Sequence, residues 1–98
     1  MPQFYHKVLL QQLGGNKFIA MTGAKNFVKD TNSLSFRITN AKYGINYVKI
    51  TLNSMDTYDM EFGRIDKSEY RVISYIEGIY NDNLQETFTE NTGLDTHL

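Results

Sequence analysis

The residues of this chain best suited to chemistry are cations that stand beside aromatic side chains. They occur in four places: Lys17-Phe18, Lys25-Asn26-Phe27, Lys42-Tyr43 and Tyr47-Val48-Lys49. A cation gives charge-assisted hydrogen bonds to a phosphate, and an exposed ring can stack on a nucleobase. Because phenylalanine is usually buried, we expect Phe18 and Phe27 to fill the core. Tyr43 and Tyr47 then remain as the accessible rings for a phosphate-bearing ligand.

Two glycine turns are each followed by a lysine, a combination that can also hold a phosphate. The segments are Gly14-Gly15-Asn16-Lys17 and Thr22-Gly23-Ala24-Lys25. Backbone amides at such a turn bind anions, but a phosphate loop needs a longer glycine spacing followed by Lys-Ser or Lys-Thr. We therefore interpret these glycines as helix ends and their lysines as solvent-exposed.

The sequence gives little support for metal binding or covalent catalysis. It has two histidines, one near each end, and no cysteine. Four acidic residues are close enough in sequence to consider a divalent cation: Asp56, Asp59, Glu61 and Asp66. Strand alternation directs Asp59 and Glu61 outward, where basic neighbours such as Lys49 balance them. We expect a protein that is not an enzyme and uses neither a metal nor another cofactor.

The two halves of the chain carry opposite charge. Residues 1–55 hold seven Lys/Arg and one acid, and residues 56–98 hold three Lys/Arg and ten acids. Such a division allows one basic and one acidic face, and two copies of the chain can then be complementary. Together with unpaired sheet edges, this favours a homodimer. The overall charge of −1 argues against a general nucleic-acid binder, which is normally basic.

Length and composition are those of one globular domain over residues 1–98. The chain is 41% hydrophobic and 21% charged, with one proline. An apolar run of ~18–20 residues, as a transmembrane helix needs, does not occur in the sequence. The N-terminus lacks the charged-then-apolar layout of a signal peptide. We expect a soluble protein of the cytoplasm.

Both ends of the chain have helical periodicity. Residues 3–13 predict an amphipathic helix with Phe4, Val8, Leu9 and Leu13 on its apolar side. Residues 16–22 form either a second short helix or a buried strand. Near the C-terminus the helical spacing involves Ile79, Tyr80, Leu84 and Phe88. Gly93 ends this helix, and we expect residues 95–98 to fray.

The middle of the chain has the period of a sheet. Apolar and polar residues alternate over 34–38, 47–53 and 58–62, with weaker strand signals at 26–29 and 70–76. Alternation with one polar face is typical of an antiparallel sheet that is packed on one side only. The predicted fold is α+β: an antiparallel meander of about four to five strands packed on N-terminal and C-terminal helices.

The expected register brings the cations together. A five-residue turn at 53–57 sets residue 52 opposite residue 58, so Lys49 faces Glu61. If residues 39–46 form the whole preceding connection, residue 38 pairs near residue 48 and Arg37 lies beside Lys49. Two neighbouring cations repel unless an acid or an anion stands between them. The predicted ligand site comprises Arg37, Lys49, Tyr47 and Lys25, with Glu61 as a competing partner for Lys49.

One long segment resembles the hallmark of a family of small proteins encoded by bacteriophages, prophages and other mobile elements. It reads LGGNKFIAMTGAKNF over residues 13–27, and further similar pieces are LSFR at 34–37, NYVKITLN at 46–53 and DMEFGRI at 59–65. The resemblance covers nearly the whole chain. It implies a phage setting inside a bacterial cell and assigns no site residue.

That setting, with the charge pattern, gives the expected functions. The first is a non-enzymatic binding protein that inhibits a host defence protein or sequesters an anionic nucleotide signal. The alternatives are a nucleic-acid-binding accessory protein and a phage structural or assembly component. A flat charged patch with apolar anchors would favour the inhibitor, whereas a deep pocket with cations and a tyrosine would favour nucleotide capture.

Overall fold

The computed structural model describes residues 5–94, which form a five-stranded antiparallel sheet with three helices. The strands follow one another in the order β1-β2-β3-β4-β5, which confirms the predicted α+β meander. The elements are α1 (His6–Leu13), α2 (Asn16–Thr22), β1 (Lys25–Lys29), β2 (Ser33–Arg37), the 3-10 turn η1 (Lys42–Gly44), β3 (Tyr47–Leu52), β4 (Tyr58–Asp66), β5 (Glu69–Ile79), the 3-10 turn η2 (Asn81–Asn83) and α3 (Leu84–Thr92). No helix in this part of the chain has the length and apolar character needed to cross a bilayer.

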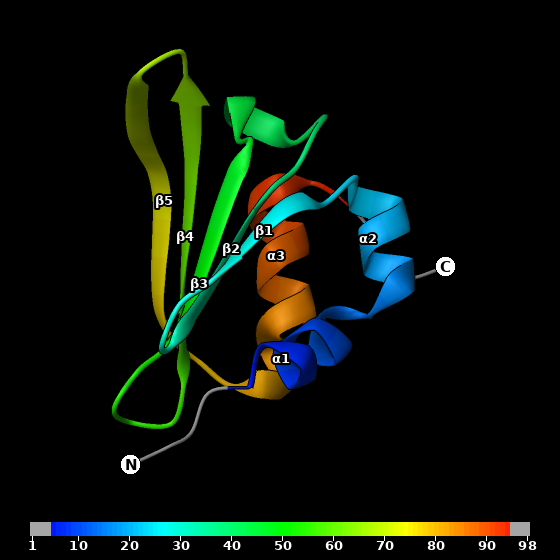
Figure 1. Ribbon diagram of the computed structural model, residues 1–98, viewed down its shortest axis with the longest axis vertical. Coiled ribbons are helices and arrows are strands. Elements are labelled where there is room, and N and C mark those ends of the chain that lie inside the picture. Colours follow the sequence, from blue (N-terminus) through cyan, green and yellow to red (C-terminus); the bar gives the residue numbers. More distant parts are fainter. Residues whose placement is uncertain (1–4, 95–98) are drawn as a thin grey trace.

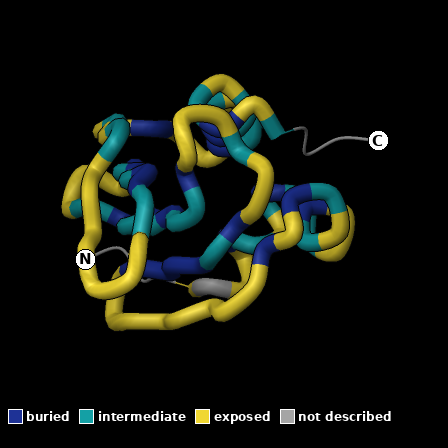
Figure 2. The backbone as a smooth tube through the Cα atoms, turned by 90° about the horizontal axis from the view of Figure 1, so that it is seen from above, coloured by how far each residue is buried: buried dark blue, intermediate teal, exposed yellow. Residues whose placement is uncertain are grey.

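All three helices lie on the same side of the sheet, and no other element of residues 5–94 covers the opposite side (Figure 1). Figure 2 shows buried stretches toward the middle of the molecule and long exposed stretches around its outline. The two sides of the sheet therefore differ in exposure: the helices cover one side and leave the other open to solvent. We call the side that the helices cover the inner face and the bare side the outer face.

The core lies between the inner face and the helices. Alternate residues of the central strands are fully buried there, as the period of two predicts: Leu34, Phe36, Val48, Ile50, Met60 and Phe62. Phe18 of α2 and Phe88 of α3 pack on these strands from the helical side, and the centroids of these two rings are 5.0 Å apart. Phe18 also lies edge-on to Phe36, at 5.5 Å. Four phenylalanines thus join two helices to the sheet.

Phe27 corrects the expectation of a second buried ring in β1. It touches Phe36 at a centroid distance of 5.4 Å but remains 37% exposed, because β1 is the edge of the sheet. Every residue of this strand is exposed.

The N-terminal segments are both helical. Leu9 and Leu13 of α1 are fully buried, as predicted, whereas Val8 is exposed and does not belong to the apolar side. The predicted start at residue 3, and Phe4 with it, lies outside the described residues. Residues 16–22 are a helix and not a strand, and it ends at Gly23, whose φ of 69° is left-handed.

The C-terminal helix begins later than the sequence periodicity indicates. Ile79 is the last residue of β5 and is buried against the core, while Tyr80 is exposed in the connection. The turn η2 separates them from α3, in which Leu84 and Phe88 are buried as predicted. Gly93, with φ of 75°, ends α3 as expected. The predicted frayed tail, residues 95–98, lies outside the described residues.

The register of β3 with β4 agrees with the prediction, and that of β2 with β3 does not. Lys49 pairs with Glu61, as expected from the turn at 53–57. Across β2 and β3, however, Phe36 pairs with Val48, so Arg37 lies opposite Tyr47 and Ser35 opposite Lys49. The connection is effectively shorter than assumed, because Asn46 already belongs to the ladder: the Ile38 N–H donates to the Asn46 carbonyl at 3.1 Å.

Asn46 also links this end of β3 to β4 through its side chain. Its Nδ2 donates to the Ile65 carbonyl at 2.9 Å, and its Oδ1 accepts from the Ile65 N–H at 2.8 Å. The backbone N–H of Asn46 donates to the Gly63 carbonyl at 3.0 Å. The Asn46 side-chain amide thus pairs with the backbone N–H and carbonyl of Ile65, as a strand residue would, and holds the C-terminal part of β4 against the start of β3.

Candidate functional site on the outer face

The outer face brings three of the four predicted ligand residues into one row. Lys25 pairs with Arg37, and Arg37 pairs with Tyr47, so these three side chains neighbour each other across β1, β2 and β3. Lys49 stands in the next row, between Ser35 and Glu61. The prediction that Arg37 lies directly beside Lys49 is therefore wrong: Arg37 lies one row further along the sheet, beside Tyr47.

Two of the predicted ligand residues, Arg37 and Tyr47, already make contacts with other residues of the chain. The Arg37 Nε donates to the Asn46 carbonyl at 3.2 Å, so the side chain lies along the end of β3. Tyr47 is half-buried, not fully accessible, because its ring meets that of Tyr70 edge-on at 5.3 Å. Tyr43 is exposed, as expected, but lies in η1.

Tyr70 is the main outer-face residue that the sequence interpretation missed. Its ring covers Gly63, where an added Cβ would lie 2.5 Å from ring carbon Cε1. Its hydroxyl donates to Glu61 Oε2 at 2.5 Å. A glycine inside a strand often marks such a close approach, which is the signal that could have indicated the contact.

The acid expected to balance Lys49 thus has another partner. Glu61 lies opposite Lys49 in register, and one of its oxygens accepts the hydrogen bond from Tyr70. A carboxylate can accept several hydrogen bonds, so Glu61 retains capacity toward a further donor.

Charges on the outer face are divided by sign. Three cations lie on the outer face, one from each of the first three strands: Lys25 of β1, Arg37 of β2 and Lys49 of β3. None of these strands contains an acid. Strand alternation places Asp59 and Glu61 of β4 and Glu77 of β5 on the same face. The face therefore has a cationic part over β1–β3 and an anionic part over β4–β5, which reflects part of the charge division of the sequence.

Apolar side chains accompany the charges at the two edges. Val72 and Tyr75 of β5 are 50% and 52% exposed, and Val28 of β1 is also exposed. Tyr70 is exposed beside them. Together these residues give the face apolar anchors around its charged centre, an arrangement typical of protein-binding surfaces.

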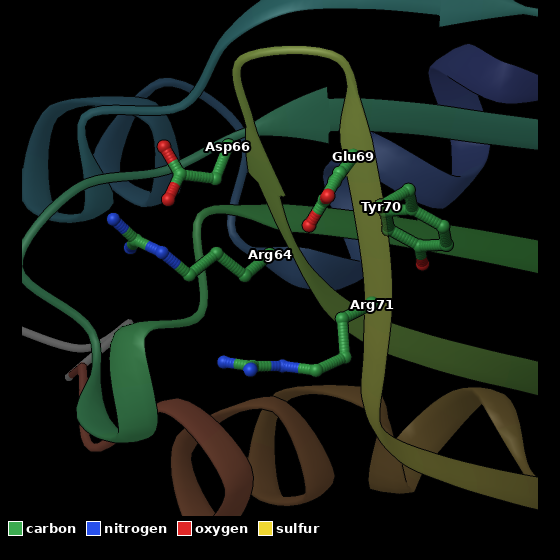
Figure 3. A pocket seen from close by; sticks show the side chains of 5 residues that line it. All are labelled: Arg64, Asp66, Glu69, Tyr70 and Arg71. Atoms are coloured by element: carbon green, nitrogen blue, oxygen red, sulfur yellow. The ribbon is translucent and has the colours of Figure 1, made fainter.

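Three hollows in the described surface are lined by other residues. The first, about 110 Å³, lies at the β4–β5 hairpin beside Arg64, Asp66, Glu69, Tyr70 and Arg71. Figure 3 shows Arg64 and Arg71 extending in the same direction, with the Tyr70 ring turned away from them. The other two, about 340 Å³ and 420 Å³, are shallow openings beside Tyr43 and Glu90 and beside Asp59 and Glu77, respectively. None of the three contains Lys25, Arg37, Tyr47 or Lys49.

Acid clusters that could hold a metal ion are also missing from residues 5–94. Among the side chains that the structure describes, no group of three His, Cys, Asp or Glu is arranged to hold a metal ion. The Asp59 carboxylate is used structurally: its Oδ1 accepts from Asn53 Nδ2 at 2.9 Å and from the Gly78 N–H at 3.1 Å.

Tyr70 gives a test of the outer-face geometry in solution. Burial, and then the hydrogen bond to Glu61, raises the pKa of Tyr70 well above its ordinary value of 10.0. Its protonated form is therefore favoured by folding: this stability is present below pH 10 and is lost as the pH rises further. The pKa values of Tyr58 and Tyr75 are also raised by burial and nearby acids, so we expect an alkaline absorbance titration to show a late phenolate component that Tyr70→Phe reduces by one tyrosine. Tyr80→Phe, at an exposed tyrosine, should leave that component in place; identical curves for wild type and Tyr70→Phe would contradict the contact.

Comparisons with known proteins do not assign the chain to a family. It matches no protein-family model, no curated protein and no solved structure.

Proposed function

We propose that this chain is a non-enzymatic binding protein of the bacteriophage type, which docks its outer face on a host protein and inhibits it. The observation that carries the proposal is the bare sheet face, with cations and acids in separate halves and exposed Val28, Val72 and Tyr75 at its edges. Separated charges orient a partner, and exposed apolar and tyrosine side chains supply contact area. The resemblance to phage-encoded proteins supports the host setting.

A nucleotide ligand is the second candidate, and one observation favours it. Lys25, Arg37 and Tyr47 form a row that offers two cations and a ring. The row lies on an open sheet face, however, and small-molecule sites are usually enclosed clefts. Protein docking is therefore the better-supported function. Titration of the protein with nucleotides and oligonucleotides separates the two: heat of binding that Arg37→Ala abolishes would favour the nucleotide.

The docking proposal predicts which surface a host protein needs. Immobilised wild-type protein should retain a host protein from bacterial lysate, and Val72→Ala/Tyr75→Ala should lose it, because both side chains are exposed on the outer face. Interface anchors of this kind cost about 1 kcal/mol or more each when truncated, so the double variant should bind at least about tenfold more weakly. Lys17→Ala, at an exposed residue of α2, is the matched control and should bind normally. Equal retention by all three proteins would exclude the outer face.

A further inference from the structure

We infer that a second copy of this chain covers the outer face when no other protein does, through a two-fold axis that runs parallel to β3. The inference rests on the proposed function in one respect, namely that it uses the same docking face. It adds the identity of an occupant and the contacts that hold it. A host protein would then compete with the second copy.

Symmetry makes this arrangement complementary in charge. In the order β1-β2-β3-β4-β5 the middle strand is β3. A two-fold rotation about an axis along β3, in front of the outer face, keeps the strand direction and reverses the strand order. β1 and β2 then lie over β5 and β4 of the second copy, and the same contact occurs twice. β3 lies over β3 of the second copy, so the two Lys49 side chains come near each other, between the Glu61 carboxylates of the two copies. Two sheets packed in this way stay within about 30° of parallel, as in β-sandwiches.

The contact at the centre is specific. Because strand direction is kept, each row of one copy meets the same row of the other, and Glu61 of the second copy lies over Ser35. Ser35 is small and 9% exposed, and it stands next to Lys49 across the strands and two residues from Arg37. It forms the floor between these two cations. The Glu61 carboxylate of the second copy thus enters between Arg37 and Lys49, where two cations need an anion.

Apolar contacts in the neighbouring positions fit as well. The row that contains Lys49 runs from Val28 at the β1 edge to Tyr75 on β5. Reversal of the strand order sets exposed Val28 against exposed Tyr75 of the second copy, at both ends of the row. In the next row Tyr70 of the second copy, which covers Gly63, comes over Arg37, in position for a cation–π contact.

Association through the β1 edge is less favourable. Two β1 edges would bring Lys25 and Lys29 against the same residues of the other copy. Like charges directly opposite each other are destabilising in a sheet. Face-to-face packing instead sets Arg37 of each copy against Glu61 of the other.

The size of the face predicts a weak dimer. Five strands about 4.8 Å apart, each about six residues long at about 3.3 Å per residue, span about 500 Å² on each copy. Both copies together bury about 1,000 Å², the lower limit for specific interfaces, so the dimer should be transient. Its charge pairing should make it weaker at high salt, where the Debye length falls to about 3 Å.

A charge exchange between two variants tests the inference. Arg37→Glu alone sets an acid against Glu61 of the second copy, and Glu61→Arg alone sets a cation against Arg37, so each variant should be monomeric. In an equimolar mixture both contacts regain opposite signs, and a heterodimer should form. Sedimentation velocity at low salt should show wild-type dimer and mixed heterodimer, and each variant alone at least about tenfold weaker in association. Lys17→Glu, an exposed α2 residue on the helical side of the molecule, is the control and should dimerise normally.

The outcomes separate this inference from the proposed function. Circular dichroism establishes that each variant is folded. A monomeric wild type at high micromolar concentration and low salt, or a folded mixture that stays monomeric, overturns the second-copy inference. If the wild type still captures a host protein through Val72 and Tyr75, the proposed function survives that result. If the wild type dimerises and the mixed variants form a heterodimer, but no host protein is retained from lysate, the second-copy inference is supported. The same result counts against docking on a host protein.

Discussion

Phe18→Ala should lower the free energy of unfolding by about 3–5 kcal/mol, the usual cost of truncating a fully buried phenylalanine. Phe18 is fully buried and touches both Phe36 of β2 and Phe88 of α3. Its removal leaves a cavity at the point where two helices meet the sheet. Small domains have total stabilities of about 5–15 kcal/mol, so this change removes a large share. Urea unfolding, followed by circular dichroism, measures the loss.

Phe27→Ala is the matched control for this prediction. It removes the same side chain and also a contact with Phe36, but from an edge strand where the ring is partly exposed. We expect a clearly smaller loss, because less apolar surface returns to water and no closed cavity forms. Equal losses for the two variants would contradict the placement of the core between α2, α3 and the inner face.

Asn46→Ala should cost about 1–3 kcal/mol, because it leaves a backbone donor and acceptor without partners. The Asn46 side chain bonds both the N–H and the carbonyl of Ile65, and alanine can make neither bond. We expect faster hydrogen exchange at the Ile65 amide than at neighbouring β4 amides. Denaturant unfolding gives the change in stability.

Asn32→Ala is the control for Asn46. Asn32 is exposed between β1 and β2, and its backbone carbonyl, which alanine retains, accepts from the Leu52 N–H at 2.8 Å. Exposed substitutions of this kind usually change stability by less than about 0.5 kcal/mol. A loss from Asn46→Ala no larger than that from Asn32→Ala would mean that the Ile65 bonds contribute little.

Much of the fold can be predicted because one face of each central strand must be buried. Leu34, Phe36, Val48, Ile50 and Met60 repeat with a period of two, and a slip by one residue would expose them all. The same patterning fixes the β3–β4 register, since the turn between these strands is short. The order of the strands then follows from short connections between neighbours.

The errors occur where local patterns have two interpretations. Ile79 and Tyr80 have a helical spacing relative to Leu84, yet Ile79 ends β5 and Tyr80 lies in the connection, because η2, formed by Asn81-Asp82-Asn83, separates them from α3. The β2–β3 register depends on Asn46, whose backbone carbonyl accepts from the Ile38 N–H, while its side chain bonds Ile65 of β4 and holds this end of β3 in place. That bond requires Ile65, 19 residues away in sequence, so local propensity does not indicate it.

The candidate site could be predicted only in part for the same reason. That Arg37, Tyr47, Lys49 and Glu61 share the outward face follows from alternation within each strand. Which of them are neighbours depends on register between strands, and Arg37 proved to lie beside Tyr47. The cover of Gly63 by Tyr70 depends on a hairpin register and a rotamer, neither of which is apparent from the sequence.

The contact between Phe18 and Phe88 also has a consequence for synthesis on the ribosome. Neighbouring strands of the meander can pair as soon as each hairpin has emerged from the exit tunnel. The core cannot close at that stage, because Phe88 and the Gln85 Nε2 that donates to the Leu13 carbonyl at 2.8 Å arrive 70 or more residues after their partners. A nascent sheet with an uncovered inner face would be a site for chaperones, and docking of α3 would be the step that releases the chain from them.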